Sequence, residues 1–251
     1  MATRAFEFIR RPVRRILKSR SERKLVRGIK VLDTAPTSLL DNVEWLEGTI
    51  RSIGLKYLPP PYEECYGLDA RYMNFHGDGL FQIPRQFAKF LSLVAMHRPT
   101  TFIEIGTNNG WSACVAAAYL RRFNPDFELT TIDIVDHFSA WPRVARLLPL
   151  KFVVGKTSDD YAGKAFDTCF IDGDHSLAWV DRDFRNVGQH ARVCAFHDIN
   201  DSLTDINDGA GSRTHWNALK ASLSDSSTLT EILDHTQSRS VMGIGIFTRR
   251  D

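Results

Sequence analysis

Two segments of the sequence end an apolar run in groups that bind cations or carry protons. The run over residues 167–172 ends in Asp172, and Asp198 directly follows the run over residues 192–197. In a parallel sheet the carboxyl ends of adjacent strands meet at the edge where ligands bind, so we expect these carboxylates to face each other. Close carboxylates repel, and a divalent cation relieves the repulsion. An oxygen-rich site favours Mg²⁺ or Mn²⁺ over zinc.

Histidine side chains flank this pair of carboxylates and offer general-base chemistry. His175 lies three residues after Asp172, within reach of a substrate hydroxyl, and His197 directly precedes Asp198. Imidazole titrates near neutral pH, which suits proton transfer. Without a metal, His175 or His197 would act alone. The alternative for each histidine is a hydrogen-bonded loop residue, and for each aspartate a helix cap. The occurrence of all four side chains at adjacent strand ends favours a catalytic function over these alternatives.

A glycine-rich turn, EIGTNNGWS over residues 104–112, joins a predicted strand to a predicted helix. Gly106 and Gly110 have no Cβ, so the backbone there can approach a ligand closely. Their GxxxG spacing differs from the GxGxxG fingerprint of dinucleotide-binding sites. Glu104 places a carboxylate beside the turn, which suits a ligand with positive charge, such as the amino and sulfonium groups of S-adenosylmethionine (SAM). An ordinary strand–turn–helix joint without a ligand is the alternative.

Two later strand ends extend this candidate site. Asp133 ends the next apolar run, and an acidic residue at that position can accept hydrogen bonds from both hydroxyls of a ribose. The alternative for Asp133 is a helix N-cap. Thr157 and Ser158 lie in the loop after the third run and are candidates for the wall of an adenine pocket.

Short apolar runs alternate with longer segments along the chain, and this alternation indicates the elements that position these residues. The runs cover residues 101–105, 128–133, 151–155, 167–172, 192–197, 229–234 and 241–247. This pattern predicts an α/β, Rossmann-like fold, with a seven-stranded, mostly parallel sheet and helices on both faces. Two helices are expected before the sheet, over residues 36–53 and 83–97, with Pro84 in the first turn of the second.

The N-terminal segment differs from the rest in charge. Residues 1–30 hold eleven Lys or Arg and two Glu, which gives +9 in a chain whose net charge is +2. Apolar residues recur among them at helical spacing, which predicts a basic amphipathic helix that Pro12 kinks or restarts. Peripheral contact with an anionic membrane is one interpretation, and packing on the domain or on a second copy in a homo-oligomer is the other. We divide the chain into an arm (1–35), a helical and irregular cap (36–84) and a catalytic domain (85–251).

Composition limits the class of protein. Of the 251 residues, 43% are hydrophobic and 25% charged, as in soluble globular proteins. No apolar run approaches the roughly 18–20 residues of a membrane span, and the basic N-terminus lacks the features of a secretory signal. The four cysteines are far apart in sequence and are expected to be free thiols. We therefore expect a cytoplasmic protein with no specific nucleic-acid partner. If the membrane interpretation of the arm holds, the contact is peripheral and runs through residues 1–30.

The motifs EIGTNNGWS, the acidic end of TTID, FIDGDHS, FHDI and MGIGIF occur in this order along the chain. Over roughly residues 85–248 the sequence resembles the class I SAM-dependent methyltransferases, in particular a group of small-molecule and sugar O-methyltransferases with an IDGDHSY signature. The resemblance implies SAM as cofactor and methylation of a hydroxyl on a sugar or other small polyhydroxylated acceptor, as in glycan biosynthesis. It also implies assistance from Mg²⁺ or Mn²⁺.

The resemblance also implies roles for individual residues. The SAM-binding residues that the resemblance implies are Glu104, Gly106, Gly110, Ser112 and Asp133. We add their neighbours and the adjacent strand ends to the predicted cofactor site, namely Thr107, Asn108, Ile134, Ser158 and Asp172. The implied metal ligands are Asp172 and Asp198, and the implied general base is His175. Together with Asp172 and His197, which the residues themselves suggest, His175 makes up the predicted catalytic group. This chain departs from the pattern at His197, where the metal-dependent members usually carry a carboxylate.

Two other functions are compatible with the predicted fold class. The first is an NAD(P)-dependent oxidoreductase, against which the missing GxGxxG motif argues. The second is a non-catalytic, membrane- or complex-associated domain that keeps the SAM-binding fold, against which the intact motifs argue. A titration with SAM and NAD(H) would separate the first alternative from the methyltransferase.

Overall fold

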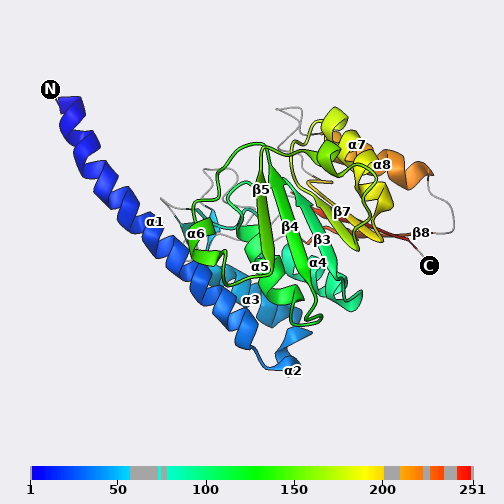
Figure 1. Ribbon diagram of the computed structural model, residues 1–251, viewed down its shortest axis with the longest axis horizontal. Coiled ribbons are helices and arrows are strands. Elements are labelled where there is room, and N and C mark those ends of the chain that lie inside the picture. The colour runs from blue at the N-terminus through cyan, green and yellow to red at the C-terminus, as the bar shows by residue number, and fades with distance from the viewer. Residues whose placement is uncertain are drawn as a thin grey trace.

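The computed structural model describes residues 2–56, 73–74, 78–200, 210–222, 227–234 and 242–249, with side chains from residue 17 onward. Its centre is a seven-stranded sheet in the order β5-β4-β3-β6-β7-β9-β8 (Figure 1). The strands are β3 (Thr101–Ile105), β4 (Glu128–Asp133), β5 (Leu150–Val154), β6 (Thr168–Ile171), β7 (Val193–His197), β8 (Ser227–Ile232) and β9 (Ile244–Arg249). The predicted fold class is confirmed.

The strand order creates a ligand-binding crevice at the centre of the sheet. From β3 the chain proceeds outward to β4 and β5, and then returns to place β6 and β7 on the other side of β3. These five strands are parallel, whereas β9 pairs antiparallel with both β7 and β8. In such sheets the crevice lies outside the carboxyl ends of the strands where the order reverses. The loops after β3 and β6 therefore flank the expected site.

Helices cover both faces of the sheet because consecutive strand residues point to opposite sides. Phe102 and Phe170 belong to a core that also holds apolar residues of the N-terminal helices, whereas Ile103 and Ile171 belong to a second core. The first core includes α3 (Val43–Ile53), α4 (Pro84–Met96) and α5 (Trp111–Leu120). The second core includes α7 (Leu177–Asn186) and α8 (Gly211–Ser222).

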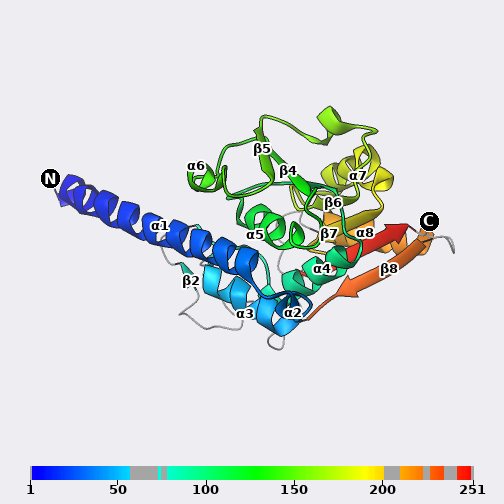
Figure 2. The same cartoon turned by 60° about the horizontal axis from the view of Figure 1, so that its bottom comes forward.

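The basic N-terminal segment forms one long helix, α1 (Ala2–Thr34), which continues through Pro12 without a restart. Its N-terminal part extends away from the sheet, as Figures 1 and 2 show. Nearer the domain, Leu25, Ile29 and Leu32 are buried in the same core as α3 and α5. Of the two interpretations of the arm, packing on the domain therefore holds for this part of α1.

The cap region departs from the prediction of a single helix over residues 36–53. It forms α2 (Thr37–Leu40) and α3, because the side chain of Asn42 accepts a hydrogen bond from the Trp45 amide (2.8 Å) and starts a new helix. Leu55–Lys56 (β1) and Met73–Asn74 (β2) form a small parallel pair beside it. Most of the predicted linker and irregular segment over residues 58–83 lies outside the described residues.

The last two strands lie at different residues from those predicted. Strand β9 begins at Ile244 rather than at residue 241, because Met242 and Gly243 have φ of 59° and 80°, a left-handed turn that cannot continue a strand. Strand β8 begins two residues earlier than expected, at Ser227, where it pairs with Arg249 at the far end of β9.

Two predictions from composition can be compared with the structure. Cys114, Cys169 and Cys194 are buried free thiols, as expected, and Cys65 lies outside the described residues. Among the helices that the structure describes, none combines the length and the hydropathy needed to cross a bilayer.

Candidate functional site

A cavity of about 730 Å³ opens at the carboxyl edge of the sheet, over the ends of β3, β4, β6 and β7. This volume is typical of small-molecule sites in enzymes. The cavity is lined by the predicted cofactor residues Gly106, Thr107, Asn108, Ser112, Asp133, Ile134, Ser158 and Asp172. It is also lined by His175, His197 and Asp198. One cavity thus brings together two groups of residues that the sequence analysis predicted separately.

The turn after β3 depends on its glycines for packing. Gly106 has φ of 99°, and a Cβ there would lie 2.1 Å from the carbonyl oxygen of Asp172. Gly110 has φ of 75°, and a Cβ there would lie 2.3 Å from the ring of Phe138. The first glycine therefore lets the β3 and β6 loops touch at the crevice. The second lies behind the cavity rather than among its lining residues.

Glu104 also lies behind the cavity wall and is not among the described residues that line it. Its side chain is 1% exposed, and both carboxyl oxygens accept hydrogen bonds, from Ser112 Oγ (2.6 Å) and Thr131 Oγ1 (2.5 Å). Burial raises the pKa of Glu104 to about 8, although the two hydroxyl donors act in the opposite direction. The geometry gives Glu104 the role of holding Ser112, which does line the cavity.

The raised pKa of Glu104 predicts a pH-dependent stability. The folded protein retains a proton on Glu104 that the unfolded chain releases, so stability falls as pH rises from about 4.5 to about 8. In the Glu104→Gln variant this contribution is absent. We therefore expect the difference between the two melting temperatures (variant minus native) to become more positive as pH rises across this range. Asp126→Asn, in an exposed loop, is the control, and an equal pH profile for Glu104→Gln and the native protein would contradict the prediction.

Asp133 ends β4 at the cavity edge and anchors two loops. Its Oδ2 accepts a hydrogen bond from the Asn108 amide (2.8 Å), and its Oδ1 accepts one from the Val135 amide (3.1 Å). The next helix, α6 (Trp141–Val144), begins further along the chain, so Asp133 is not its N-cap. A carboxylate oxygen accepts more than one hydrogen bond, so Asp133 can also receive both hydroxyls of a ribose.

Residues of the loop after β5 line the same cavity as Asp133. Thr157 caps the short 3₁₀ helix Ser158–Tyr161, and Ser158 is fully buried. Asp183, on α7, also lines this wall, and burial raises its pKa to about 6. Sequence analysis missed Asp183, because its position within an amphipathic helix gives no sign that it faces a cavity.

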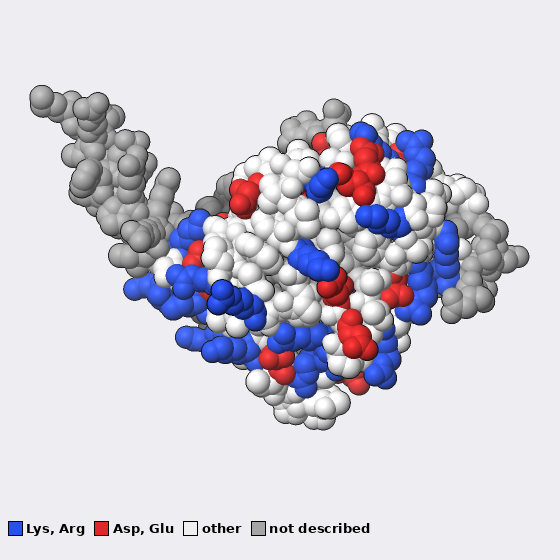
Figure 3. All heavy atoms as spheres, viewed as in Figure 1, with Lys and Arg blue, Asp and Glu red and all other residues white. Residues whose placement is uncertain are grey.

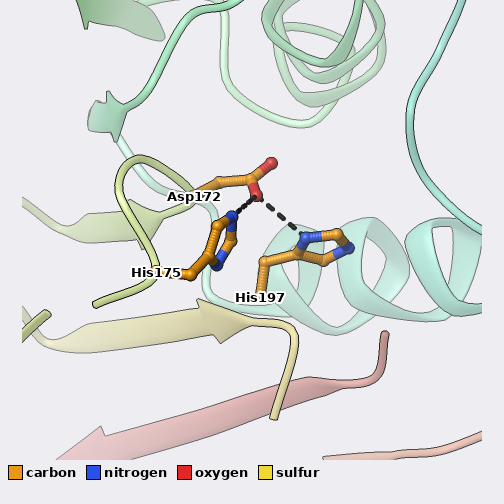
Figure 4. A group of neighbouring side chains, drawn as sticks. All are labelled: Asp172, His175 and His197. Carbon is orange, nitrogen blue, oxygen red and sulfur yellow. Dashed lines mark ion pairs between the residues drawn. The ribbon is translucent and has the colours of Figure 1, made fainter. Parts of the chain in front are cut away.

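The imidazole and carboxylate side chains form one cluster at the ends of β6 and β7, of which Figure 4 shows Asp172, His175 and His197. His197 Nδ1 lies 2.9 Å from Asp172 Oδ1 and 3.2 Å from Asp198 Oδ1. His175 Nε2 lies 3.9 Å from Asp172 Oδ1, and His175 Nδ1 lies 3.5 Å from Asp198 Oδ2. The structure therefore brings all four predicted side chains together, with each histidine next to both carboxylates.

Two residues that the sequence analysis did not single out hold this cluster in place. Gln82 Nε2 donates a hydrogen bond to Asp172 Oδ2 (2.7 Å), and Ser212 Oγ lies 3.2 Å from His175 Nδ1. Gln82 precedes α4 and Ser212 lies on α8, so both are far in sequence from their partners. No local motif marks either residue, and only the packing of α4 and α8 on the sheet brings them to the cluster.

Asp198 shows two features that are uncommon for an aspartate. Its φ is 60°, in the left-handed region that L residues seldom occupy. Its Oδ1 is buried and accepts no hydrogen bond from the part of the chain that the structure describes. Strain and an unsatisfied buried oxygen both carry a cost in free energy, and they concentrate at functional sites.

Comparisons with known proteins agree with this geometry. Residues 103–201, which include the β3 turn, Asp133 and the whole cluster, match a family model described as a methyltransferase domain. This part of the chain is therefore similar in sequence to methyltransferase domains. The match favours methyl transfer over the alternative of an NAD(P)-dependent oxidoreductase. No curated protein sequence matches the chain.

Solved structures of methyltransferases share the fold. The O-methyltransferase TomG from Streptomyces achromogenes, determined with SAM, is 20% identical over 68% of this chain and 82% of its own, with a TM-score of 0.51. An O-methyltransferase from Bacillus cereus, determined with SAH, is 16% identical over 92% of this chain and 100% of its own, with a TM-score of 0.50. At these identities the likeness supports the fold of the methyltransferase domain.

Proposed function

We propose that the protein transfers the methyl group of SAM to a hydroxyl oxygen of a sugar or other small polyhydroxylated acceptor. The observation that carries this proposal is that a single cavity is lined both by the nucleotide-type site around Asp133 and by the cluster of two histidines and two aspartates. Methyl transfer requires both in one place, because the donor sulfonium and the acceptor oxygen must be aligned for direct displacement.

In the nucleotide-type half, each group offers what one part of SAM requires. Asp133 offers acceptors for the two ribose hydroxyls, and Ser158 lies where an adenine would be enclosed. Asp172, beside Gly106, offers negative charge to the amino or sulfonium group of the ligand. The presence of SAM in TomG and of SAH in the Bacillus cereus enzyme supports the same choice of cofactor here.

In the other half, the cluster supplies a proton acceptor. As the acceptor oxygen forms its bond to the methyl carbon, the bond from that carbon to sulfur breaks and its electron pair stays on sulfur, which gives SAH. The hydroxyl proton passes to His175, and Asp172 and Asp198 stabilise the resulting imidazolium. Phe81 and Trp179 also line the cavity and provide flat faces of the kind that pack on a sugar ring.

A divalent cation is the remaining part of this proposal. Asp172 and Asp198 would hold it. The buried Oδ1 of Asp198 accepts no hydrogen bond from the described residues and lies 3.2 Å from His197 Nδ1, which supports a cationic partner at that point. When bound, the cation would lower the pKa of the acceptor hydroxyl and help to position it.

Calorimetric titration and an acceptor screen test the proposed function together. We expect the protein to bind SAM and SAH but not NAD(H). In a mass-spectrometric screen of sugars and other polyols, we expect the mass of an acceptor to increase by about 14 Da for each methyl group transferred, the net gain of one CH₂. Binding of NAD(H) in place of SAM would overturn the proposal. Amines in the same screen test the acceptor atom, because transfer only to nitrogen would overturn the assignment to oxygen.

Replacing Asp133 with alanine is expected to weaken SAM binding strongly. The variant loses charged hydrogen bonds to the ribose that contribute about 1.5–3 kcal/mol each at most, or about tenfold to a hundredfold in Kd per bond. Isothermal titration with SAM measures the change. Asp126→Ala, in an exposed loop between α5 and β4, is the matched control. Equal affinity of Asp133→Ala and the native protein would remove Asp133 from the cofactor site.

We also propose a cytoplasmic location in which α1 makes peripheral contact with anionic lipid. On the described part of this helix, Lys18, Arg20, Arg23, Arg27 and Lys30 are exposed. Figure 3 shows basic side chains gathered on the lower left of the molecule, next to the grey part of the arm. Each such side chain can contribute about 1 kcal/mol near an anionic surface. The contact would bring the active site close to lipid-linked acceptors.

Co-sedimentation with phosphatidylserine-containing vesicles tests the contact. Because Leu25 and Ile29 are buried in the core, the test uses the full chain with the five exposed basic residues of α1 changed to glutamine rather than a truncation. We expect the native protein to sediment at low salt, and much less at moderate salt or with the variant. Neutral vesicles are the control. Equal sedimentation of variant and native protein would refute the contact.

A further inference from the structure

We infer that the cluster at the ends of β6 and β7 is a metal centre for an imidazole-binding divalent cation such as Zn²⁺, rather than for Mg²⁺. Asp172, His175 and His197 each offer one ligand atom, and these atoms lie within 4.8 Å of one another. The inference deepens the proposed function, since it assigns the ion at the same site. It differs from the expectation based on Asp172 and Asp198 alone, which favoured Mg²⁺ or Mn²⁺.

The distances within the cluster suit ligands of one small ion. Two ligand atoms about 2.1 Å from a metal, and about 90–109° apart, lie about 3.0–3.4 Å from each other. His197 Nδ1 is 2.9 Å from Asp172 Oδ1 and 3.2 Å from Asp198 Oδ1. His175 approaches the two carboxylates with different ring nitrogens: Nε2 lies 3.9 Å from Asp172 Oδ1, and Nδ1 lies 3.5 Å from Asp198 Oδ2. Only one of these nitrogens would bind the same ion. The His175 side chain is 26% exposed, so it has room to rotate toward an ion.

The chemical types of the donors decide between cations. Mg²⁺ prefers six oxygen ligands and keeps several waters, whereas imidazole suits Zn²⁺, Fe²⁺, Co²⁺ and Ni²⁺. The His197 side chain is 4% exposed and lies between the two carboxylates, so an ion that contacts both carboxylates also meets this imidazole. Two imidazoles with one or two carboxylates form a mixed nitrogen and oxygen set, which later transition metals bind more tightly than Mg²⁺ does.

Groups around the cluster support the same conclusion. Metal ligands in proteins are oriented by hydrogen bonds from an outer layer of side chains. Here Gln82 donates to Asp172 Oδ2, which leaves Oδ1 facing the histidines, and Ser212 contacts His175 Nδ1. The buried Oδ1 of Asp198 accepts no hydrogen bond from the described residues, so a cation would satisfy it.

A cation at this cluster gives His175 a different role from the proton transfer proposed above. With the ion bound, one nitrogen of His175 would be a ligand. Without the ion, His175 would be the proton acceptor. The alternative is that the histidines and aspartates form ion pairs only, with no metal. Metal binding, measured in the absence of SAM and acceptor, separates these cases without reference to turnover.

Cobalt titration of the metal-free, full-length protein tests the inference. We expect one equivalent of Co²⁺ to produce visible d–d absorption bands, Zn²⁺ to abolish them at about stoichiometric amounts, and Mg²⁺ to leave them unchanged in about thousandfold excess. Absence of saturable Co²⁺ binding, or displacement of Co²⁺ by equimolar Mg²⁺, would overturn the inference. Since SAM binding is titrated separately, failure of this test leaves the proposed methyl transfer intact.

Variants identify the ligands. His197→Asn and His175→Asn should each lower Co²⁺ affinity by more than about 100-fold, because loss of even an outer hydrogen-bond partner costs about 10- to 100-fold. His197→Asp should raise the affinity for Mg²⁺ relative to Zn²⁺ by at least about tenfold. His190→Asn, on an exposed turn, should bind Co²⁺ as the native protein does. If the buried His197 variants do not fold, the more exposed His175→Asn still tests the site, and unchanged affinity there would refute it.

Discussion

Replacing His175 with asparagine is expected to lower the rate constant for methyl transfer by about 10²- to 10⁴-fold, the usual contribution of a positioned acid or base. The substitution removes a ring whose nitrogens contact Asp172 and Asp198, while the fold and the SAM half of the cavity keep their contacts. The loss is expected with or without a bound cation, because the same side chain is either the proton acceptor or a ligand.

Single-turnover kinetics at saturating SAM, together with a SAM titration, measure this effect. We expect SAM affinity to stay close to the native value, so the change appears in the rate constant and not in cofactor binding. His190→Asn is the matched control, since that histidine is exposed and lies outside the residues that line the cavity. A His175→Asn variant with native turnover would exclude His175 from the reaction.

The Gly106→Ala substitution should have the largest effect on the folded structure. A Cβ at this position would lie 2.1 Å from the carbonyl oxygen of Asp172, and the residue has φ of 99°. The overlap involves backbone atoms, so the β3 and β6 loops must separate. We expect a loss of about 2–6 kcal/mol in the free energy of unfolding, from strain of about 1–3 kcal/mol and overpacking of about 1–3 kcal/mol. SAM binding should be lost with it.

Gly155→Ala separates the two causes. Gly155 also has a positive φ, 72°, but no heavy atom of the described chain lies within 4 Å of a Cβ built there. This variant should lose only about 1–2 kcal/mol and should retain SAM binding. Chemical denaturation and SAM titration of both variants test the argument. Equal stability of the two variants would show that the contact between the β3 and β6 loops is not tight.

Which parts of the fold the sequence predicts depends on the range of the interactions involved. The first five strands were predicted within one or two residues, because apolar runs and the turns that follow them are local features. The boundaries of β8 and β9 were less accurate. For β9 the reason is that Met242 and Gly243 belong to the apolar run but adopt a left-handed backbone conformation, which excludes them from the strand. The break between α2 and α3 likewise depends on a single cap at Asn42.

For the candidate site, the sequence by itself determined which residues stand at the carboxyl edge of the sheet. Asp133, Asp172, His175 and His197 each end or follow a strand, and parallel strands bring those ends together by topology alone. The same reasoning predicted the glycine turn at Gly106.

Only the tertiary structure decided how those residues are arranged. Glu104 and Ser112 were predicted as equal members of the cofactor site, but the pleat of β3 turns Glu104 toward α5, where it supports Ser112 from behind. Gln82 and Ser212 reach the cluster through helices packed on opposite faces of the sheet. Such contacts depend on how closely distant segments pack, and this information lies in the combined shapes of many side chains rather than in any local pattern.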